Sequence, residues 1–296
     1  MAEKPIVYFT KNITSESMVK IYDALNKDLK GKVAVKLHSG EPGNQNFLKP
    51  DFFEDIVKHV NGIVVECNTA YDGKRNESKK HRETLIKHGW EEMFTVDLMD
   101  EEGPDMVLDI PDGKILKKNY VGKTLKNYDS MLVLSHFKGH PMGGFGGALK
   151  QLSIGVASTV GKTYIHSAAN ETDQYKLWDN LPPQDDFLVS MGDSAASVVR
   201  HFNGNMAFIN VMKNMSVDCD CCAVAEDPCM KDIGILASLD PVAIDQACVD
   251  LVYNSKDPGK AKLIERIESR NGLLTIKAAA DLKIGSREYT LVSLDD

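Results

Sequence analysis

Short runs of β-branched residues alternate with longer segments of helical polar–apolar periodicity along the first third of the chain. Strands are predicted at 5–10, 32–39, 62–70 and 93–100, and helices at 15–29, 49–60 and 79–89. Such alternation implies crossover connections between parallel strands. The sequence therefore predicts a layered α/β fold, with a mostly parallel or mixed sheet flanked by helices.

The remaining two thirds continue in the same style. Strands are predicted at 130–136, 161–167 and 206–217, helices at 194–202 and 241–253, and a helix plus a terminal strand pair within 262–294. Asp240 suits the N-cap and Pro241 the first position of the helix at 241–253. No repeat or linker divides the chain, so we predict one α/β unit over 1–296, with 1–125 and 126–296 as candidate sub-lobes.

Charge and hydropathy exclude several classes of protein. The 296 residues carry a net charge of −8, with an isoelectric point near 5.5, so the phosphate backbone of a nucleic acid would be repelled. We expect no membrane association, because no stretch approaches the ~20 apolar residues of a membrane span. The first residues lack a secretory pattern, so we expect a cytoplasmic protein with reduced thiols. The oligomeric state is left open.

Four of the six cysteines fall within eleven positions: Cys219, Cys221, Cys222 and Cys229. The C-x2-C spacing of Cys219 and Cys222 lets two thiolates bind one ion from a tight turn, and Cys229 is a candidate fourth ligand. Thiolates favour zinc, Cu(I) or iron–sulfur clusters. The spacing matches neither a zinc-finger pair nor a ferredoxin run, so the sequence leaves the metal open.

The alternative is that these cysteines are small core residues, since free cysteine is among the most buried residue types. Asp218 and Asp220 alternate with the thiols, however, and carboxylates are poor core material. The pattern favours a metal or redox site over a purely structural role.

A glycine-rich segment follows the strand predicted at 130–136. Gly143, Gly144, Gly146 and Gly147 would let backbone N–H groups approach an anion, and Lys150 would add a positive charge. Ligands of open α/β sheets bind beyond the carboxyl ends of strands, where this segment is predicted to lie. The alternative is a strand-to-helix turn that needs glycine only for its backbone angles.

Three histidines are predicted near the same segment. His136 and His140 precede the glycines, and His166 ends the strand predicted at 161–167. Each alone is typical of a hydrogen-bonded structural residue. Together with Lys150 they are candidates for acid–base catalysis or ligation near neutral pH.

Polar loops follow two of the predicted strands. Their candidate site residues are Glu41, Asn44, Asn68, Tyr71, Lys74 and Arg75. They would line the edge of the sheet where the glycine segment lies, or serve only as turn residues, and the sequence favours neither. On the helix at 241–253, Asp245 is predicted to be partly buried and Cys248 to lie in the core.

Several blocks of the sequence occur in an order that resembles the DUF362 family, often associated with iron–sulfur centres. They are "VKLHSGEPGN", "NTAYDGKRNESKKH", "SHFKGHPMGGFGGALKQLSIGVAS", "GKTYIHS", "DCDCC" and "DIGILASLDPVAIDQACVDL". The resemblance extends from about Val35 to Leu251 and implies a thiolate-bound iron–sulfur cluster or zinc. It also implies a redox partner protein.

This chain departs from the family pattern at one place. Many members carry an inserted ferredoxin module with two C-x2-C-x2-C-x3-C runs, whereas residues 168–183 occupy that place here and contain no cysteine. Cys219, Cys221 and Cys222 match the family's "DCDCC" block, and Cys229 lies outside it. The resemblance therefore supports a site at the first three cysteines without implying electron transfer through a ferredoxin module.

The segment "GHPMGGFGGALK" is also similar to the H…G-[FY]-S-G-G-x-K block of the lactate racemase (nickel-pincer) family. His140, the glycines and Lys150 correspond, while Gly146 replaces the usual serine. This similarity implies that the segment holds an organic anion or a cofactor.

These observations lead to three hypotheses. The first is a metal at the cysteines with a small anionic ligand on the glycine segment. If the two sites share one cleft, a metal-assisted or redox enzyme is implied; if they are far apart, the thiols are structural. The second is a racemase- or lyase-like enzyme that uses histidine and lysine on a carboxylate. The third is a non-enzymatic metal-binding protein. A distance of no more than ~8 Å from Lys150 to the sulfurs of residues 219–222 would favour one shared cleft.

Overall fold

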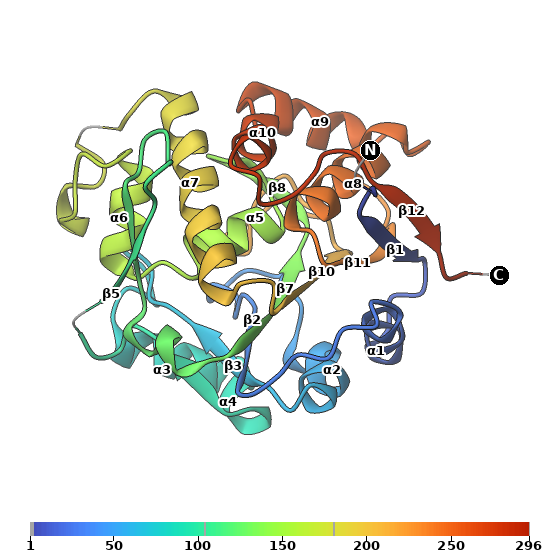
Figure 1. Cartoon of the computed structure of the whole chain (residues 1–296), viewed down its shortest axis with the longest axis horizontal. Helices are drawn as coiled ribbons and strands as arrows, with labels where there is room; N and C mark the ends of the chain where they lie inside the picture. Colours follow the sequence, from blue (N-terminus) through green and yellow to red (C-terminus); the bar gives the residue numbers. More distant parts are fainter. Residues whose placement is uncertain (1–2, 104, 180, 296) are drawn as a thin grey trace.

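An eight-stranded sheet forms the centre of the computed structural model, which describes residues 3–103, 105–179 and 181–295 (Figure 1). Its strands, in chain order, are β1 (Ile6–Thr10), β2 (Val33–Lys36), β3 (Ile63–Glu66), β4 (Val96–Leu98), β7 (Ser130–His136), β10 (Met206–Met212), β11 (Gly234–Ser238) and β12 (Thr290–Ser293). Across the sheet the order is β12-β1-β11-β10-β7-β2-β3-β4.

The sheet is mixed, with a single strand running against the others. β11 pairs antiparallel with both β1 and β10, and all other pairs are parallel. Two hairpins stand apart from the sheet, β5 (Met106–Asp109) with β6 (Lys118–Val121), and β8 (Lys138–His140) with β9 (Gly144–Gly146). The predicted α/β fold with a mostly parallel or mixed sheet is confirmed.

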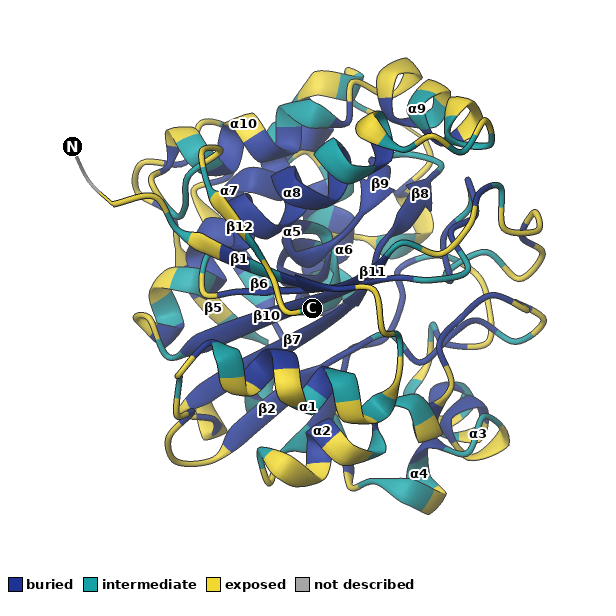
Figure 2. Ribbon diagram, turned by 90° about the vertical axis from the view of Figure 1, so that its right-hand side faces the viewer, coloured by how far each residue is buried: buried dark blue, intermediate teal, exposed yellow. Residues whose placement is uncertain are grey.

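One face of the sheet is covered by helices from the first third of the chain. They are α1 (Ser15–Ala24), the 3-10 turn η1 (Pro50–Phe53), α2 (Glu54–His59), α3 (Ser78–Lys87) and α4 (Trp90–Met93). The hydroxyl of Thr14 caps α1 by accepting from Ser17 N at 3.1 Å. Figure 2 shows the buried inner sides of α1 and α2 turned toward the sheet and their exposed sides turned outward.

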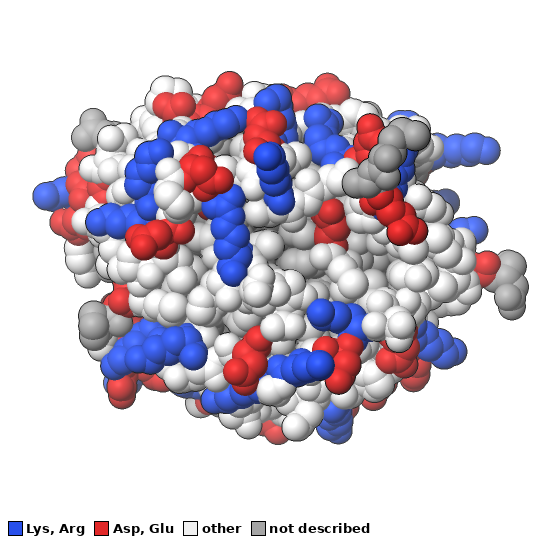
Figure 3. Space-filling model, in the orientation of Figure 1, with Lys and Arg blue, Asp and Glu red and all other residues white. Residues whose placement is uncertain are grey.

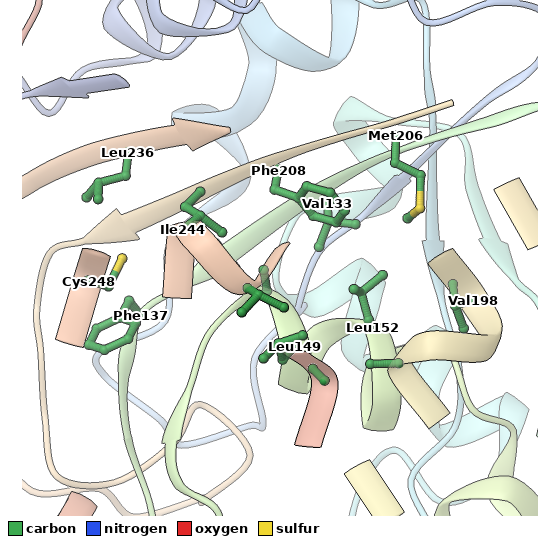
Figure 4. Close-up of a cluster of buried hydrophobic side chains, with 14 of the residues drawn as sticks. Val133, Phe137, Leu149, Leu152, Val198, Met206, Phe208, Leu236, Ile244 and Cys248 are labelled. Atoms are coloured by element: carbon green, nitrogen blue, oxygen red, sulfur yellow. The ribbon is translucent and has the colours of Figure 1, made fainter. Parts of the chain in front are cut away.

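The opposite face carries the helices of the second half. They are α5 (Ala148–Lys150), the π-helix η3 (Gln151–Gly155), α6 (Thr159–His166), α7 (Gln184–Phe202), α8 (Pro241–Asn254), α9 (Lys260–Ser269) and α10 (Leu273–Asp281). In Figure 4, Val133 and Phe208 of the sheet meet Leu149, Leu152 and Ile244. Asp240 caps α8, with Pro241 in the first turn, as predicted. Cys248 is a buried member of the same core, also as predicted.

The prediction of a strand over 161–167 is wrong, because residues 161–166 lie in α6, which ends at His166. The hydroxyl of Ser158 caps this helix by accepting from Gly161 N at 3.1 Å. Thr163 and Ile165 gave the segment its strand-like composition, but both are buried on the helix. Helix α6 packs against α7 and β6, and this tertiary packing overrides the β propensity.

The prediction of a helix plus a strand pair over 262–294 is also wrong. The tail contains two helices, α9 and α10, and one strand, β12, which pairs with β1 instead of with a neighbour in the tail. Asn271 has a φ of +51° between the helices, and Gly272 lies so close to Gly143 that a Cβ there would be 2.9 Å from its carbonyl oxygen. A helix break is required there, and the sequence pattern alone did not show it.

Both candidate sub-lobes contribute strands to the central sheet, and the division at residue 125 stays a prediction. Within the described ranges, no helix is long and apolar enough to cross a lipid bilayer. On the face drawn in Figure 3, lysine and arginine side chains are interspersed with aspartate and glutamate.

Polar residues gather where four neighbouring parallel strands end. β2 ends at Lys36, β3 at Glu66, β7 at His136 and β10 at Met212. The loops that leave these strands carry the cysteines and most of the other candidate site residues. This is the edge at which open α/β sheets bind ligands.

Candidate functional site

The cysteines lie in the long connection from β10 to β11, which we call the cysteine loop (213–233). The loop closes on itself: Cys229 N donates to Met215 O at 2.8 Å, and Ile233 N donates to Met212 O at 2.9 Å. Gly139 N donates to Ser216 O at 2.8 Å, which ties the loop to hairpin β8–β9. A Cβ at Gly139 would lie 2.3 Å from Val217 O, so glycine is needed for this approach.

A second loop, residues 39–46, holds the cysteine loop from the other side. Glu41 N donates to Asp220 O at 2.9 Å, and the Asn44 side-chain amide donates to Cys222 O at 2.8 Å and Cys219 O at 3.3 Å. The Tyr71 hydroxyl donates to Cys221 O at 3.2 Å. These polar residues, whose role the sequence left open, therefore position the cysteines through backbone carbonyl groups.

Lys150 joins the glycine segment to the cysteines. Its Nζ lies 3.4 Å from the Sγ of Cys219, which is fully buried. The Nε2 of His140 lies 3.9 Å from the Sγ of Cys221. His140, Cys219 and Cys221 offer ligand atoms that all lie within 4.8 Å of one another, so this group could hold a metal ion. The distance expected for one shared cleft is met.

The electrostatics of the group favour a thiolate at Cys219. Burial alone raises the pKa of Cys219, but the thiol of Cys221 and the ammonium groups of Lys150 and Lys138 bring it well below the usual value. The hydrogen bond to Cys219 raises the pKa of Cys221 well above its usual value. Burial lowers the pKa of Lys150, but the sulfurs of Cys219 and Cys221 raise it by more, so this lysine stays charged. An ammonium–thiolate pair results.

The ring of His140 is held in one tautomer. Its Nδ1 accepts hydrogen bonds from Gly143 N at 2.8 Å and Met142 N at 3.2 Å. A neutral imidazole that accepts at Nδ1 carries its proton on Nε2. His140 therefore presents an N–H donor to the sulfurs, whereas a metal-binding histidine normally donates from its other nitrogen.

His136 supports the cysteine loop through contacts with Asp220 and Lys213. Its Nδ1 lies 3.0 Å from the Asp220 carboxylate and its Nε2 lies 2.5 Å from Lys213 O, so both nitrogens face oxygen acceptors. Lys138 Nζ also contacts Asp220, at 2.6 Å. Burial raises the pKa of Asp220, but His136 and Lys138 together bring it below its ordinary value.

A cavity of about 60 Å³ opens beside the thiols. Three cationic side chains line it, Arg75, Lys150 and Lys162, together with His140, His166 and Cys221. Trp178 stands at its wall with 52% of its surface exposed. A space of this size holds several water molecules or one small ligand.

Two of the cavity's cations lack a carboxylate partner. Arg75 pairs with Glu41 at 2.8 Å and approaches Glu66 at 3.8 Å. Among the described residues, no carboxylate forms an ion pair with Lys150 or with Lys162. The Nζ of Lys162 donates to Ala157 O at 2.6 Å. Glu66 also lines the cavity but pairs with Lys36 at 2.6 Å, so the ammonium groups of Lys150 and Lys162 can interact with a small anion.

His166 has the opposite tautomer to His140. Its Nδ1 donates to Lys162 O at 2.7 Å, which leaves the lone pair on Nε2. Its ring stacks on Phe187, with 5.0 Å between centroids. Burial lowers the pKa of His166 to about 4, so the ring is neutral near pH 7. A neutral ring with a free nitrogen at a cavity wall can accept a proton or bind a metal.

The glycine segment packs closely within the protein. The amides of Ala148 and Leu149 donate to the Asp245 carboxylate at 2.7 and 2.9 Å, and a Cβ at Gly147 would lie 2.4 Å from that carboxylate. Gly144 has a φ of +80° and lies against Gly272. These amides are thus occupied by Asp245, and Lys150 is the part of the segment that reaches the cavity. Anion binding by the backbone of Gly143, Gly144, Gly146 and Gly147 stays a prediction.

Cys229 lies apart from the other three candidate ligands. Its Sγ donates to Met215 O at 3.3 Å, and its side chain packs against the hydrophobic core. Cys222 follows Cys221 in a tight turn in which Cys222 N donates to Cys219 O at 2.9 Å. The group that could hold a metal consists of His140, Cys219 and Cys221; Cys222 adjoins it in the same turn but is not part of it, and Cys229 lies apart.

Residues 33–250 match the family model described as a domain of unknown function, DUF362. The chain belongs to the DUF362 family. No curated protein matches the chain. The family match extends from β2 to the last turns of α8, and so includes every residue of the site described above.

Two solved structures show a distant likeness to this DUF362 chain. The lactate racemase apoprotein from Thermoanaerobacterium thermosaccharolyticum aligns with 14% identity and a TM-score of 0.44, over 70% of this chain and 50% of that one. A protein from Thermotoga maritima aligns with 10% identity and a TM-score of 0.42, over 92% of this chain and 60% of that one. The chain thus spans half and 60% of their lengths, and likenesses this weak carry no functional argument.

Several buried charges of this DUF362 site were not predicted from the sequence. Lys36 pairs with Glu66 at 2.6 Å, fully buried, and Lys162 lines the cavity. A signal was present, because Lys36 and Glu66 end the apolar runs "VAVK" and "IVVE", where a charge must find a partner on burial. Lys162 offered no comparable signal, since its segment was predicted to be a strand.

Proposed function

We propose that this DUF362 protein is an enzyme that acts on a small organic anion beside a thiolate-bound metal. One observation carries the proposal: Lys150 contacts the sulfur of Cys219 and also lines the cationic cavity. A ligand held by Lys150 would therefore lie next to the thiols. Groups in such close contact are what metal-assisted catalysis requires.

The donor set fits a soft metal. Cys219, Cys221 and Cys222 offer three sulfurs, which suit zinc or an iron–sulfur cluster better than magnesium or calcium. Three protein ligands around zinc leave one coordination position for substrate, as in catalytic zinc sites. When bound, the metal would supply Lewis-acid or redox chemistry. The N–H of His140 and the ammonium of Lys150 would donate to the sulfurs and offset their negative charge.

The chain's own side chains supply the remaining functions. Lys150 and Lys162 would bind the negative charge of the ligand, since neither has a carboxylate partner among the described residues. The Nε2 of His166 can accept a proton from a ligand in the cavity. Leu177 and Trp178 form an apolar wall that limits contact between ligand and bulk water.

The metal part of the proposal is tested by anaerobic purification with metal analysis and by titration with Co(II), whose thiolate complexes absorb visible light. We expect wild type to show sulfur-to-cobalt absorption, Cys219→Ser and Cys221→Ser to lose it, and Cys229→Ser to retain it as the matched control. Absence of metal and of cobalt absorption in wild type would refute the metal site.

The anion part is tested by a thermal-shift screen with oxalate, glyoxylate and lactate. We expect these anions to raise the melting temperature of wild type, and Lys150→Met and Lys162→Met to lose the effect. Lys277→Met, an exposed lysine on α10, is the control. Tight metal binding without any anion effect would instead support a non-enzymatic metal-binding protein.

A specific observation also favours a second candidate, an acid–base enzyme that needs no metal. His166 combines a fixed tautomer with a free Nε2 beside two lysines, which suits proton transfer at a carbon next to a carboxylate. Deuterium exchange at C2 of lactate in metal-free protein would support this racemase- or lyase-like function. Loss of exchange in His166→Gln, with exchange retained in Cys221→Ser, is the pattern it requires.

A further inference from the structure

We propose that Lys162 is a nucleophilic amine that forms an imine with a small 2-oxo carboxylate bound in the cavity. This inference rests on the anion site of the proposed function and names its substrate class. It requires no metal. It rests on how Lys162 is placed, on its neighbour His166 and on the cations that share the cavity.

Lys162 is buried, and buried lysines normally have a carboxylate partner. Its side chain lies on α6 with 6% of the residue exposed, and it reaches the cavity wall. Its Nζ has one hydrogen bond among the described residues, to Ala157 O at 2.6 Å. Since an ammonium group has three donors, Lys162 keeps donor capacity that a cavity ligand can use.

The surroundings of Lys162 lower the pKa of its ammonium group below the usual value, which makes the loss of its proton easier. Burial lowers its pKa first, and the buried Lys36 lowers it further, while Cys67 and Asp100 oppose the effect. A lysine that is desolvated next to other cations is the arrangement that activates an amine as a nucleophile. Its place at the cavity wall and this lowered pKa together make Lys162 the candidate nucleophile.

His166 is placed to move the protons that imine formation requires. It lies one helical turn after Lys162, and its Nδ1 donates to the carbonyl of Lys162 itself. The Nε2 is therefore an acceptor on the same side of α6 as the amine, and both side chains line the cavity. Phe187 stacks on the ring and holds this orientation.

The remaining cations suit the carboxylate of the same ligand. Lys150 and Arg75 line the cavity, and Lys150 has no carboxylate partner among the described residues. A 2-oxo acid places its carbonyl carbon next to its carboxylate, so one group can meet Lys162 while the other meets Lys150. The cavity of about 60 Å³ suits small 2-oxo acids such as glyoxylate or pyruvate.

The step balances with the groups present. His166 Nε2 takes a proton from the Lys162 ammonium, and the free amine forms an N–C bond with the carbonyl carbon as the C=O π bond opens onto oxygen. The oxygen then takes up a proton that the nitrogen releases, which gives a carbinolamine. The protonated His166 then returns its proton to the carbinolamine hydroxyl, which leaves as water. The products are a protonated imine and water, and no oxidant or reductant is consumed. The imine withdraws electrons from the neighbouring carbon and so eases cleavage of its C–H or C–C bond.

The experiment is reductive trapping of wild-type protein with glyoxylate and cyanoborohydride, followed by peptide mapping by mass spectrometry. Hydride addition to the imine leaves a carboxymethyl group on the lysine nitrogen. We expect Lys162 to be labelled at least ten-fold faster than the exposed Lys58 and Lys277. Oxalate has no ketone or aldehyde carbon, so it should fill the cavity and suppress labelling of Lys162 while leaving the exposed lysines unaffected.

A variant separates the charge of Lys162 from its nucleophilicity. Lys162→Arg keeps a cation but cannot form the imine, so its melting temperature should still rise with oxalate while trapping is lost. If oxalate and glyoxylate stabilise wild type but Lys162 is labelled no faster than exposed lysines, the imine proposal is overturned and the anion site stands. If neither anion stabilises the protein and Lys162 is not labelled, both proposals fail. Labelling of Lys162 that oxalate does not suppress would also overturn the assignment to this cavity.

Discussion

Replacing Lys150 with methionine should weaken the ionisation of Cys219. The Lys150 ammonium lies 3.4 Å from the Cys219 sulfur, and its contribution to the low pKa of that thiol follows from this distance. Methionine keeps most of the length and apolar volume of the side chain, so the substitution removes the charge with little change in packing.

The magnitude follows from Coulomb's law. Two unit charges 3.4 Å apart interact by about 5 kcal/mol at an effective dielectric constant of about 20. Lys138 and the His140 N–H remain in the variant, and water entering from the cavity will screen the thiolate, so we expect about 2 kcal/mol to be lost. This loss corresponds to a roughly thirty-fold smaller ionisation constant for Cys219.

The assay is ultraviolet absorbance of thiolates against pH in reduced, metal-free protein. Cys67 and Cys248 do not interfere at low pH, because burial raises the pKa of both thiols. Loss of the first ionisation in Cys219→Ser assigns the signal, and Lys277→Met controls for a change in net charge. A Lys150→Met titration that coincides with wild type would show that the lysine does not control the thiol, and the electrostatic reasoning would be wrong.

Three further predictions address stability and positioning. Asp245→Ala should lower the free energy of unfolding by about 2–4 kcal/mol in urea denaturation, because it leaves the buried amides of Ala148 and Leu149 unpaired. The surface substitution Asp281→Ala should change stability much less. Asn44→Ala should speed hydrogen exchange across residues 219–223 and weaken Co(II) binding about ten-fold, and unchanged exchange would contradict the positioning role. The pKa of His166 falls from 6.5 to about 4 on folding, so as the pH decreases the unfolded chain binds this proton before the folded protein does. Relative to His166→Gln, the free energy of unfolding of wild type should be unaffected above pH 6.5 and should fall by about 1–3 kcal/mol toward pH 4.

The central sheet could be predicted because its signals are local. The apolar run of β7 and the Asp240–Pro241 start of α8 are encoded within a few residues, and both occur where expected. The alternation of strands and helices also predicted that the glycine segment lies beyond the carboxyl end of a strand, where open α/β sheets bind ligands. Whether the cysteines share a cleft with Lys150 was left open by the sequence, because no local pattern gives the 3.4 Å contact between Lys150 and Cys219.

What could not be predicted depends on contacts distant in sequence. Helix α6 resembles a strand in composition, and its packing against β6 and α7 decides its conformation. The amides after the glycines are occupied by Asp245, which lies almost a hundred residues later. The tautomers of His140 and His166 depend on which backbone group each ring meets, and residue type carries no information about that.

The loop at 39–46 holds the cysteine loop by hydrogen bonds to main-chain carbonyl oxygens of the cysteine loop, so side chains of the cysteine loop can be replaced without loss of these bonds. Gln45 and Asn46 hold the carbonyl oxygens of Ala225 and Glu226, which any residue would supply. Val224, with 89% of its surface exposed, projects from the same gripped stretch. A fluorescent or spin label introduced at residue 224 would therefore report on the thiol centre from a fixed anchor a few residues away, without replacing any side chain that the centre uses.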